Sequence, residues 1–225
     1  MNQYKMRKIT FVLFVMVSSL YFSQINIEEI KKNVTEDPQK YYYEYLKIFK
    51  TAPKTLNQEQ LNYIYYGNNY IDYGYKRSEF NKELDEITKF TNRKISFKKI
   101  SEILEKAKLL YEQNPLNKEL IRDLYVLYRK IDNSKDSDLY FYQYELLYET
   151  IKNSGTGKLD TSPLVVTSFS DKFYAVENFS GIFSQGIDFK TKVLPDGSWL
   201  DIFKNGIDLF FVKTVHHKDM YKDDK

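Results

Sequence analysis

The segment YIYYGNNYIDYGY, residues 63–75, is the most conspicuous candidate for binding chemistry. Six of its thirteen residues are tyrosine and two are glycine. A tyrosine ring combines an apolar face with a polar hydroxyl, so the segment can either bind a ligand or pack a core. The candidate ligand-binding residues are Tyr63, Tyr66, Asn68, Tyr70, Asp72 and Tyr73.

Helical spacing divides these tyrosines between two faces. At about 100° per residue, Tyr65 shares a face with Leu61 and Ile64, so we expect Tyr65 in the core. Tyr63 and Tyr66 fall on the other side, where they either pack on a second helix or are exposed to a ligand. Low exposure of both would rule out an aromatic binding surface there.

Acidic residues near the C-terminus offer a second chemistry, hydrolysis by paired carboxylates. The candidates are Asp171, Glu177, Asp188, Asp196, Asp201 and Asp208. Glycosidases hold two carboxyl groups about 5–10 Å apart across a cleft, and spacing along a sequence does not establish such a distance. Most such residues are solvated charges at turns and strand edges.

Other motifs fit known chemistries poorly. GTGK (155–158) resembles part of a phosphate-binding loop, but Lys152 stands where that motif needs a glycine and Leu159 where it needs Ser or Thr. We therefore expect a helix end and a crossover there. His216 and His217 are the only histidines and there is no cysteine. We expect no metal site, no cofactor, and neither a Ser-His-Asp triad nor a cysteine nucleophile.

Residues 1–23 have the order of a secretory signal peptide. A basic start (Lys5, Arg7, Lys8) precedes the apolar run ITFVLFVMV (9–17), and small residues follow. The run is shorter than the roughly 20 residues of a membrane-spanning helix. We predict cleavage after Ser23, or after Ser19, and an exported protein, periplasmic or secreted, with no stable membrane span once the signal is removed.

Signal removal changes the charge balance. The whole chain has a formal net charge of +3, and the signal segment holds three basic and no acidic residues. The exported chain is therefore neutral, with 31 basic and 31 acidic residues. A nucleic-acid partner needs a clustered positive surface, so we expect none.

The elements that position these residues are mostly helical up to Gly155. Apolar periodicity predicts helices over 35–50, 61–66, 77–90, 96–115, 116–131 and 136–155. Asp37 and Pro38 are typical of a helix start, Thr55 with Gln58 of a capping box, and Gly67 of a left-handed helix stop. The hairpin around Asn114-Pro115 is loosely tetratricopeptide-like, without that repeat's 34-residue period.

Beyond Gly155 the pattern becomes short, β-branched and aromatic. We predict strands within 161–169 and over 172–176, 190–194, 198–203 and 207–213. Pro195-Asp196-Gly197 and Lys204-Asn205-Gly206 are turn signals. The fold class is therefore α+β: a linker (24–34), then one globular domain (35–215) with a helical array (35–153) and a small antiparallel β-sheet (161–213), then a flexible tail (216–225).

Three stretches together resemble a known family. YYG (65–67) followed by YIDYGY, AKLLYEQNPLNKELI (107–121) and IKNSGTGKLDTSPLVV (151–166) are similar to segments of domain of unknown function family 4919. Its members are exported bacterial proteins, mainly of Bacteroidetes, with a Leu-Tyr-Tyr-Gly motif. Ile64 stands here in place of the leucine. The resemblance implies export and an α-then-β layout, and it assigns no catalytic residue.

These observations favour binding over catalysis. We expect a non-enzymatic binding or interaction module of the cell envelope, with an unidentified protein or glycan partner. The alternative is a carboxylate-dependent periplasmic hydrolase that acts on glycan or peptide.

Overall fold

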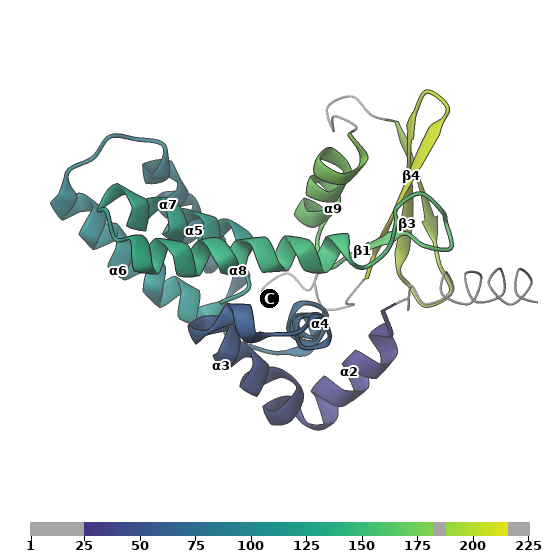
Figure 1. The fold of residues 1–225 in the computed structure, drawn as a ribbon, viewed down its shortest axis with the longest axis horizontal. Coiled ribbons are helices and arrows are strands. Elements are labelled where there is room, and N and C mark those ends of the chain that lie inside the picture. The colour runs from purple at the N-terminus through teal and green to yellow at the C-terminus, as the bar shows by residue number, and fades with distance from the viewer. Residues whose placement is uncertain (1–24, 182–187, 216–225) are drawn as a thin grey trace, which may run out of the picture.

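The computed structural model describes residues 25–181 and 188–215, and its fold is α+β as predicted (Figure 1). The helices are α2 (Ile27–Glu36), α3 (Glu44–Thr51), α4 (Gln58–Gly67), α5 (Arg77–Thr91), α6 (Phe97–Gln113), α7 (Lys118–Lys130), α8 (Ser134–Lys152) and α9 (Phe169–Ala175). Shorter helical turns are η1 (Gln39–Tyr43), η2 (Pro53–Thr55), η3 (Asn68–Tyr70) and η4 (Val176–Ser180). The strands are β1 (Leu164–Val166), β2 (Phe189–Val193), β3 (Trp199–Asn205) and β4 (Asp208–Thr214). The predicted signal segment and the tail from 216 lie outside the described residues.

Helices α5 to α8 form the array that the sequence periodicity predicts. Ser96, Asn117 and Asn133 cap α6, α7 and α8 by accepting backbone N–H bonds with their side chains. Helix α7 contacts α5, α6 and α8, and α8 in turn contacts α4 and leads into β1. In Figure 1, α8 crosses the molecule from the array to the sheet.

The predicted linker 24–34 is wrong, because most of it forms α2. Asn26 caps this helix by accepting the Glu29 amide, and Ile30 and Val34, four residues apart, are buried. Helix α2 packs on α4. Two apolar side chains on one face are enough to bury a short helix, although they make a weak periodic signal.

Two predicted boundary signals around α4 also differ from the structure. The capping box is formed by Asn57 and Gln60, two residues beyond the predicted Thr55 and Gln58, because Thr55 lies in the turn η2. Gly67 has a right-handed φ of −67° and remains within the helix. A Cβ at Gly67 would approach Val34 Cγ2 to 2.9 Å, so this glycine permits α2 to pack closely on α4.

The sheet is mainly antiparallel, as predicted, with one parallel strand pair. Its strand order is β1-β4-β3-β2; β1 runs parallel to β4, and the other neighbours are antiparallel. The parallel pairing arises because α9 and the β2–β3 hairpin separate β1 from β4 in the chain. The predicted turn at Gly197 (φ 80°) joins β2 to β3, and that at Gly206 (φ 62°) joins β3 to β4.

The predicted strand 172–176 is wrong, since these residues belong to α9 and the start of η4. Ser168 caps α9 by accepting the Asp171 amide. Asp171, Lys172, Ala175 and Val176 are all buried, which is the spacing of a helix face. Two charged residues on that face conceal its helical periodicity.

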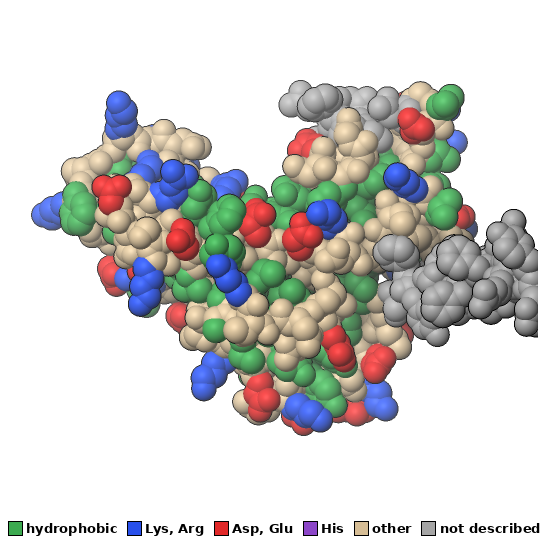
Figure 2. Space-filling model, viewed as in Figure 1, with side chains coloured by type: hydrophobic (Ala, Val, Ile, Leu, Met, Phe, Trp, Pro, Cys, Tyr) green, Lys and Arg blue, Asp and Glu red, His purple; other side chains and the backbone are tan. Residues whose placement is uncertain are grey.

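One cluster of buried apolar side chains extends from Ile30 on α2 to Val215 after β4, so array and sheet share a core. On the face shown in Figure 2, cationic and anionic side chains are interspersed. Within the described ranges, no helix is long and apolar enough to cross a membrane.

Candidate functional site

A polar pocket of about 330 Å³ lies where α4, α5, α7 and α9 meet. We call it the asparagine pocket, because five asparagines line it: Asn68, Asn69, Asn81, Asn114 and Asn117. The rings of Tyr65, Tyr75 and Phe80 also line it, as do the charged residues Arg77, Lys118, Glu119 and Asp171.

Helix ends and caps place these side chains. Helix α4 continues into η3, which carries Asn68 and Asn69. Pro115 follows the C-cap Asn114, and a residue before proline disfavours helix, so α6 ends at the pocket. Asn117 then starts α7 by accepting the Leu120 amide at 2.9 Å.

Two side-chain amides in the pocket wall each have one buried atom without a hydrogen-bond partner. Among residues 25–181 and 188–215, four buried side-chain polar atoms have no hydrogen-bond partner, and two of them are Asn69 Nδ2 and Asn114 Oδ1. A buried, unsatisfied polar atom costs about 1–3 kcal/mol. The free protein therefore holds an unpaired donor and an unpaired acceptor in the wall of one pocket.

Asn114 can present either kind of atom. Its Nδ2 donates to the Tyr75 hydroxyl at 2.7 Å, and a hydroxyl can donate as well as accept. A 180° turn of the amide would keep that bond and exchange the unpaired acceptor for a donor. Asn69 Nδ2 has no internal bond to break when it turns toward a ligand.

The charged groups of the pocket compensate one another. The buried Asp171 carboxylate pairs with the Lys118 ammonium and accepts the Tyr65 hydroxyl at 2.7 Å. Burial, together with the Asp171 charge, raises the pKa of Tyr65 well above its usual value, so its hydroxyl stays protonated and donates. Glu119 lies 3.5 Å from Arg122. With Arg77 included, two cations and two anions line the pocket.

Tyr63 and Tyr66 are core residues, with exposures of 6% and 1%. Asn33 Nδ2 donates to the Tyr63 hydroxyl at 2.6 Å, and the ring contacts those of Tyr41 and Tyr45. The Tyr66 hydroxyl donates to the Val165 carbonyl at 3.0 Å. The alternative of an exposed aromatic surface at these two positions is therefore wrong, while the expected burial of Tyr65 is confirmed.

Of the six predicted ligand-binding residues, Asn68 alone lines the asparagine pocket. Its Oδ1 accepts from the hydroxyls of Tyr42 and Tyr73 at 2.8 and 3.1 Å. Tyr70 and Tyr73 are partly buried, and the exposed Asp72 accepts the Gly74 amide. A ligand role for Tyr70, Asp72 and Tyr73 stays a prediction.

Three of the acidic candidates form ion pairs with lysines. Asp171, Asp196 and Asp201 pair with Lys118, Lys213 and Lys172 respectively. Glu177, Asp188 and Asp208 are exposed. No group of three or more His, Cys, Asp or Glu within the described part of the chain could hold a metal ion. His216 and His217 lie outside that part.

The GTGK segment is a helix end and a crossover, as predicted. The Gly157 carbonyl accepts the Phe211 amide at 2.8 Å, and a Cβ at Gly155 would meet the Pro163 carbonyl oxygen at 2.1 Å. Gly155 therefore permits close packing against the segment just before β1, and the Gly157 backbone bonds to β4.

Comparison with known proteins places the chain in a family. No curated protein and no solved structure matches it. A family model described as domain of unknown function (DUF4919) matches residues 28–191, from α2 into β2 and across the whole asparagine pocket. This match covers well over half of the chain, which therefore belongs to the DUF4919 family.

Proposed function

We propose that this protein is an exported, non-enzymatic binding protein whose asparagine pocket takes a neutral glycan. The observation that carries this proposal is the pair of unsatisfied amide atoms, Asn69 Nδ2 and Asn114 Oδ1, in the wall of one pocket. Pairing them with a ligand removes a desolvation cost that the free protein bears.

The chemistry of the wall supports a glycan. A sugar hydroxyl donates and accepts at once, so neighbouring hydroxyls satisfy an unpaired donor and an unpaired acceptor together. The rings of Tyr65, Tyr75 and Phe80 offer apolar surface to the C–H groups of a sugar. Two cations and two anions leave no net charge that would favour an ionic ligand.

Titration calorimetry on residues 24–225 tests the pocket with chito-, cello-, malto- and xylo-oligosaccharides and with anionic polygalacturonate. We expect at least one neutral oligosaccharide to bind and Asn69→Ala to weaken that binding about tenfold, which corresponds to about 1.4 kcal/mol. Asn92→Ala is the control, because Asn92 is exposed and lies outside the pocket. Binding of polygalacturonate alone, or of none of the five, overturns the proposal.

Stability separates a binding role of Asn69 from a structural one. Removal of an unpaired buried donor relieves the free protein of its desolvation cost, so Asn69→Ala should leave the free energy of unfolding unchanged or raise it. If Asn69 had a structural role instead, the same substitution would lower the free energy of unfolding.

Export is a separate part of the proposal, supported by the order of charges and apolar residues over 1–23. Mass spectrometry of the protein from a bacterial envelope fraction should find a chain that starts at Gln24, or at Leu20. An uncleaved chain in the cytoplasm would contradict export and leave the pocket proposal standing.

The hydrolase alternative is favoured by one observation, the presence of Asp171 and Glu119 in the same pocket. In this pocket the Asp171 carboxylate forms an ion pair with Lys118. Mass spectrometry of the same oligosaccharides after incubation would reveal cleavage, and Glu119→Gln should abolish any cleavage that depends on this pair.

A further inference from the structure

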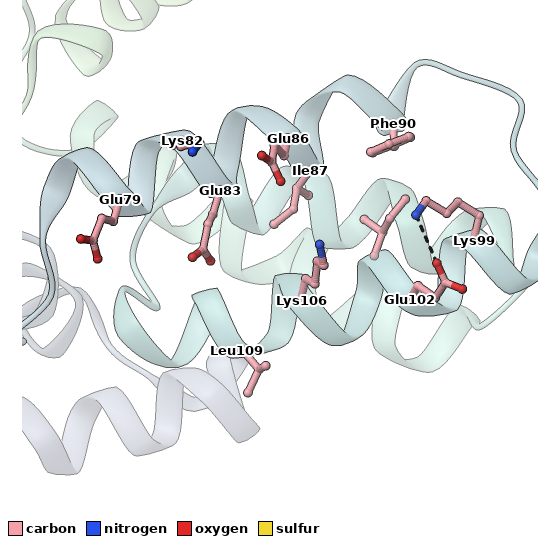
Figure 3. A pocket seen from close by; sticks show the side chains of 11 residues that line it. Glu79, Lys82, Glu83, Glu86, Ile87, Phe90, Lys99, Glu102, Lys106 and Leu109 are labelled. Carbon is pink, nitrogen blue, oxygen red and sulfur yellow. Dashed lines mark hydrogen bonds and ion pairs between the residues drawn. The ribbon is translucent and has the colours of Figure 1, made fainter.

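A second hollow lies between α5 and α6 (Figure 3). Its volume is about 480 Å³. Ile87 and Phe90 of α5 and Ile103 of α6 provide its apolar surface, and Leu109 stands at one end. We call it the α5–α6 groove.

The α5–α6 groove presents apolar surface to solvent. Leu109 lines it and is 70% exposed, although α6 buries the rest of its apolar stripe. Phe97, at the start of the same helix, is 67% exposed. Leu109 therefore places a large exposed apolar side chain at the groove, whereas Phe97 lies about 18 Å away along the helix and does not line it.

The two rims of the groove carry opposite charge. The α5 rim has Glu79, Glu83 and Glu86 against one lysine, and the α6 rim has Lys99 and Lys106 against Glu102. Local pairs neutralise part of each rim, since Glu79 pairs with Lys76 and Lys99 with Glu102.

Among the described residues, four charges that line the groove take part in no ion pair. They are Lys82, Glu83 and Glu86 on α5 and Lys106 on α6. Figure 3 shows Glu83 and Lys106 directed into the space between the two helices. Two carboxylates against one ammonium remain on α5 and one ammonium on α6, so the net unpaired charge is acidic on α5 and basic on α6.

We propose that the occupant of the α5–α6 groove is the same groove of a second copy of this chain. A two-fold axis along the groove places α5 of one copy against α6 of the other. The acidic rim then faces the basic rim twice, while Leu109 of each copy adds apolar contact. A partner of uniform charge would meet one rim of like charge, so the alternating rims favour self-association. This inference is independent of the proposed glycan site.

Charge reversal tests this symmetry directly. We expect residues 24–225 to form dimers in sedimentation experiments across the micromolar range. Glu86→Lys and Lys106→Glu should each raise the dimer dissociation constant at least tenfold. An equimolar mixture of the two variants should recover a dimer, because position 86 of each then faces position 106 of opposite charge.

Two control variants make the same changes of net charge at positions that do not line the groove. Asp85→Lys on α5 and Lys98→Glu on α6 alter exposed residues that do not line it, and both variants should dimerise like the wild type. A wild type that stays monomeric overturns the proposal, even if the groove captures another protein. Dimers that survive both groove reversals, or a mixture that stays monomeric, also overturn it.

Discussion

Asp171 and Lys172 are neighbours on α9, yet each belongs to a buried ion pair in a different setting. Asp171 pairs with Lys118 of α7 in the wall of the asparagine pocket, where the Lys118 side chain is 13% exposed. Lys172 pairs with Asp201 of β3, and both side chains are at most 2% exposed. One helix thus carries one ion pair that solvent reaches through a pocket and one that is sealed.

The sealed pair is enclosed by aromatic rings. The Lys172 ammonium lies 3.0 Å from Asp201 Oδ2 without hydrogen-bond alignment, so their attraction is chiefly electrostatic. It also lies 3.9 Å from the Phe169 ring centroid and 4.9 Å from that of Phe189. The charges of α9 thus join the helical array to the sheet, while only the ion pair on the pocket side remains accessible to a ligand.

The largest effect is expected from breaking the sealed pair. Lys172→Met leaves the Asp201 carboxylate buried without a counter-charge, and we expect a loss of about 3–5 kcal/mol in the free energy of unfolding, measured by urea titration. The double variant Lys172→Met/Asp201→Leu removes both charges and should recover most of that loss. A double variant no more stable than the single one would refute the sealed-pair interpretation.

A smaller loss is expected at the pocket. Lys118→Met should lower the free energy of unfolding by about 2 kcal/mol, because water entering the pocket hydrates the freed Asp171 carboxylate. Added salt should reduce this loss and leave that of Lys172→Met nearly unchanged, since salt screens accessible pairs more than sealed ones. Urea titrations of the two variants at low and high salt measure both losses. If the two losses and their salt dependence were equal, the two ion pairs would not differ in their access to solvent.

The adjacent residues Tyr65 and Tyr66 donate hydrogen bonds to acceptors of different charge. Tyr65 donates its hydroxyl to the charged Asp171, whereas Tyr66 donates to the neutral Val165 carbonyl. Because hydrogen bonds to charged groups are stronger, Tyr65→Phe should cost about 1.5 kcal/mol and Tyr66→Phe about 1 kcal/mol. Thermal and urea unfolding of the two variants test this order, and a reversed order would show that the pocket pair gains little from Tyr65.

Sequence patterns predict best those helices whose buried face consists of apolar residues alone. Helices α5 to α8 follow from stripes such as Ile100, Ile103, Leu104 and Ala107, all of which are buried. Helix α9 is not predicted, because its buried face contains Asp171 and Lys172, whose ion-pair partners are distant in the sequence. Helix α2 is not predicted either, because its two buried apolar residues, Ile30 and Val34, make too short a periodic pattern.

The candidate site is less predictable than the fold for the same reason. Asn69, Asn114 and Asp171 come from three separate segments and share no local spacing. Asparagine is common at helix ends, so each residue alone reads as a cap or a turn. The tyrosine-rich segment does lead to the pocket, through Tyr65, Asn68 and Asn69, while its most conspicuous rings, Tyr63 and Tyr66, are buried in the core.

The most exposed of the three ion pairs joins Lys213 and Asp196, whose side chains are 25% and 46% exposed. Partial burial acts to raise the pKa of Asp196, but bonds from Lys213 and Ser198 outweigh it and lower the pKa from 3.8 to about 2. Because the pKa of Asp196 is lower in the folded than in the unfolded protein, its charged carboxylate stabilises the fold above about pH 3.8. This stabilisation is lost as the pH falls from about 3.8 to about 2.

We therefore expect Asp196→Asn to cost less than about 1 kcal/mol at pH 7, because solvent screens so exposed a pair. The difference from wild type should shrink steadily as the pH falls below about 4. Urea titrations of both proteins at several pH values measure it, with Asp208→Asn as the control for an exposed aspartate of the same sheet. A difference that stays constant over this range would place the effect in the turn geometry of Asp196 and Ser198 rather than in charge. The order of the three ion pairs by solvent exposure would then cease to predict the order of their contributions.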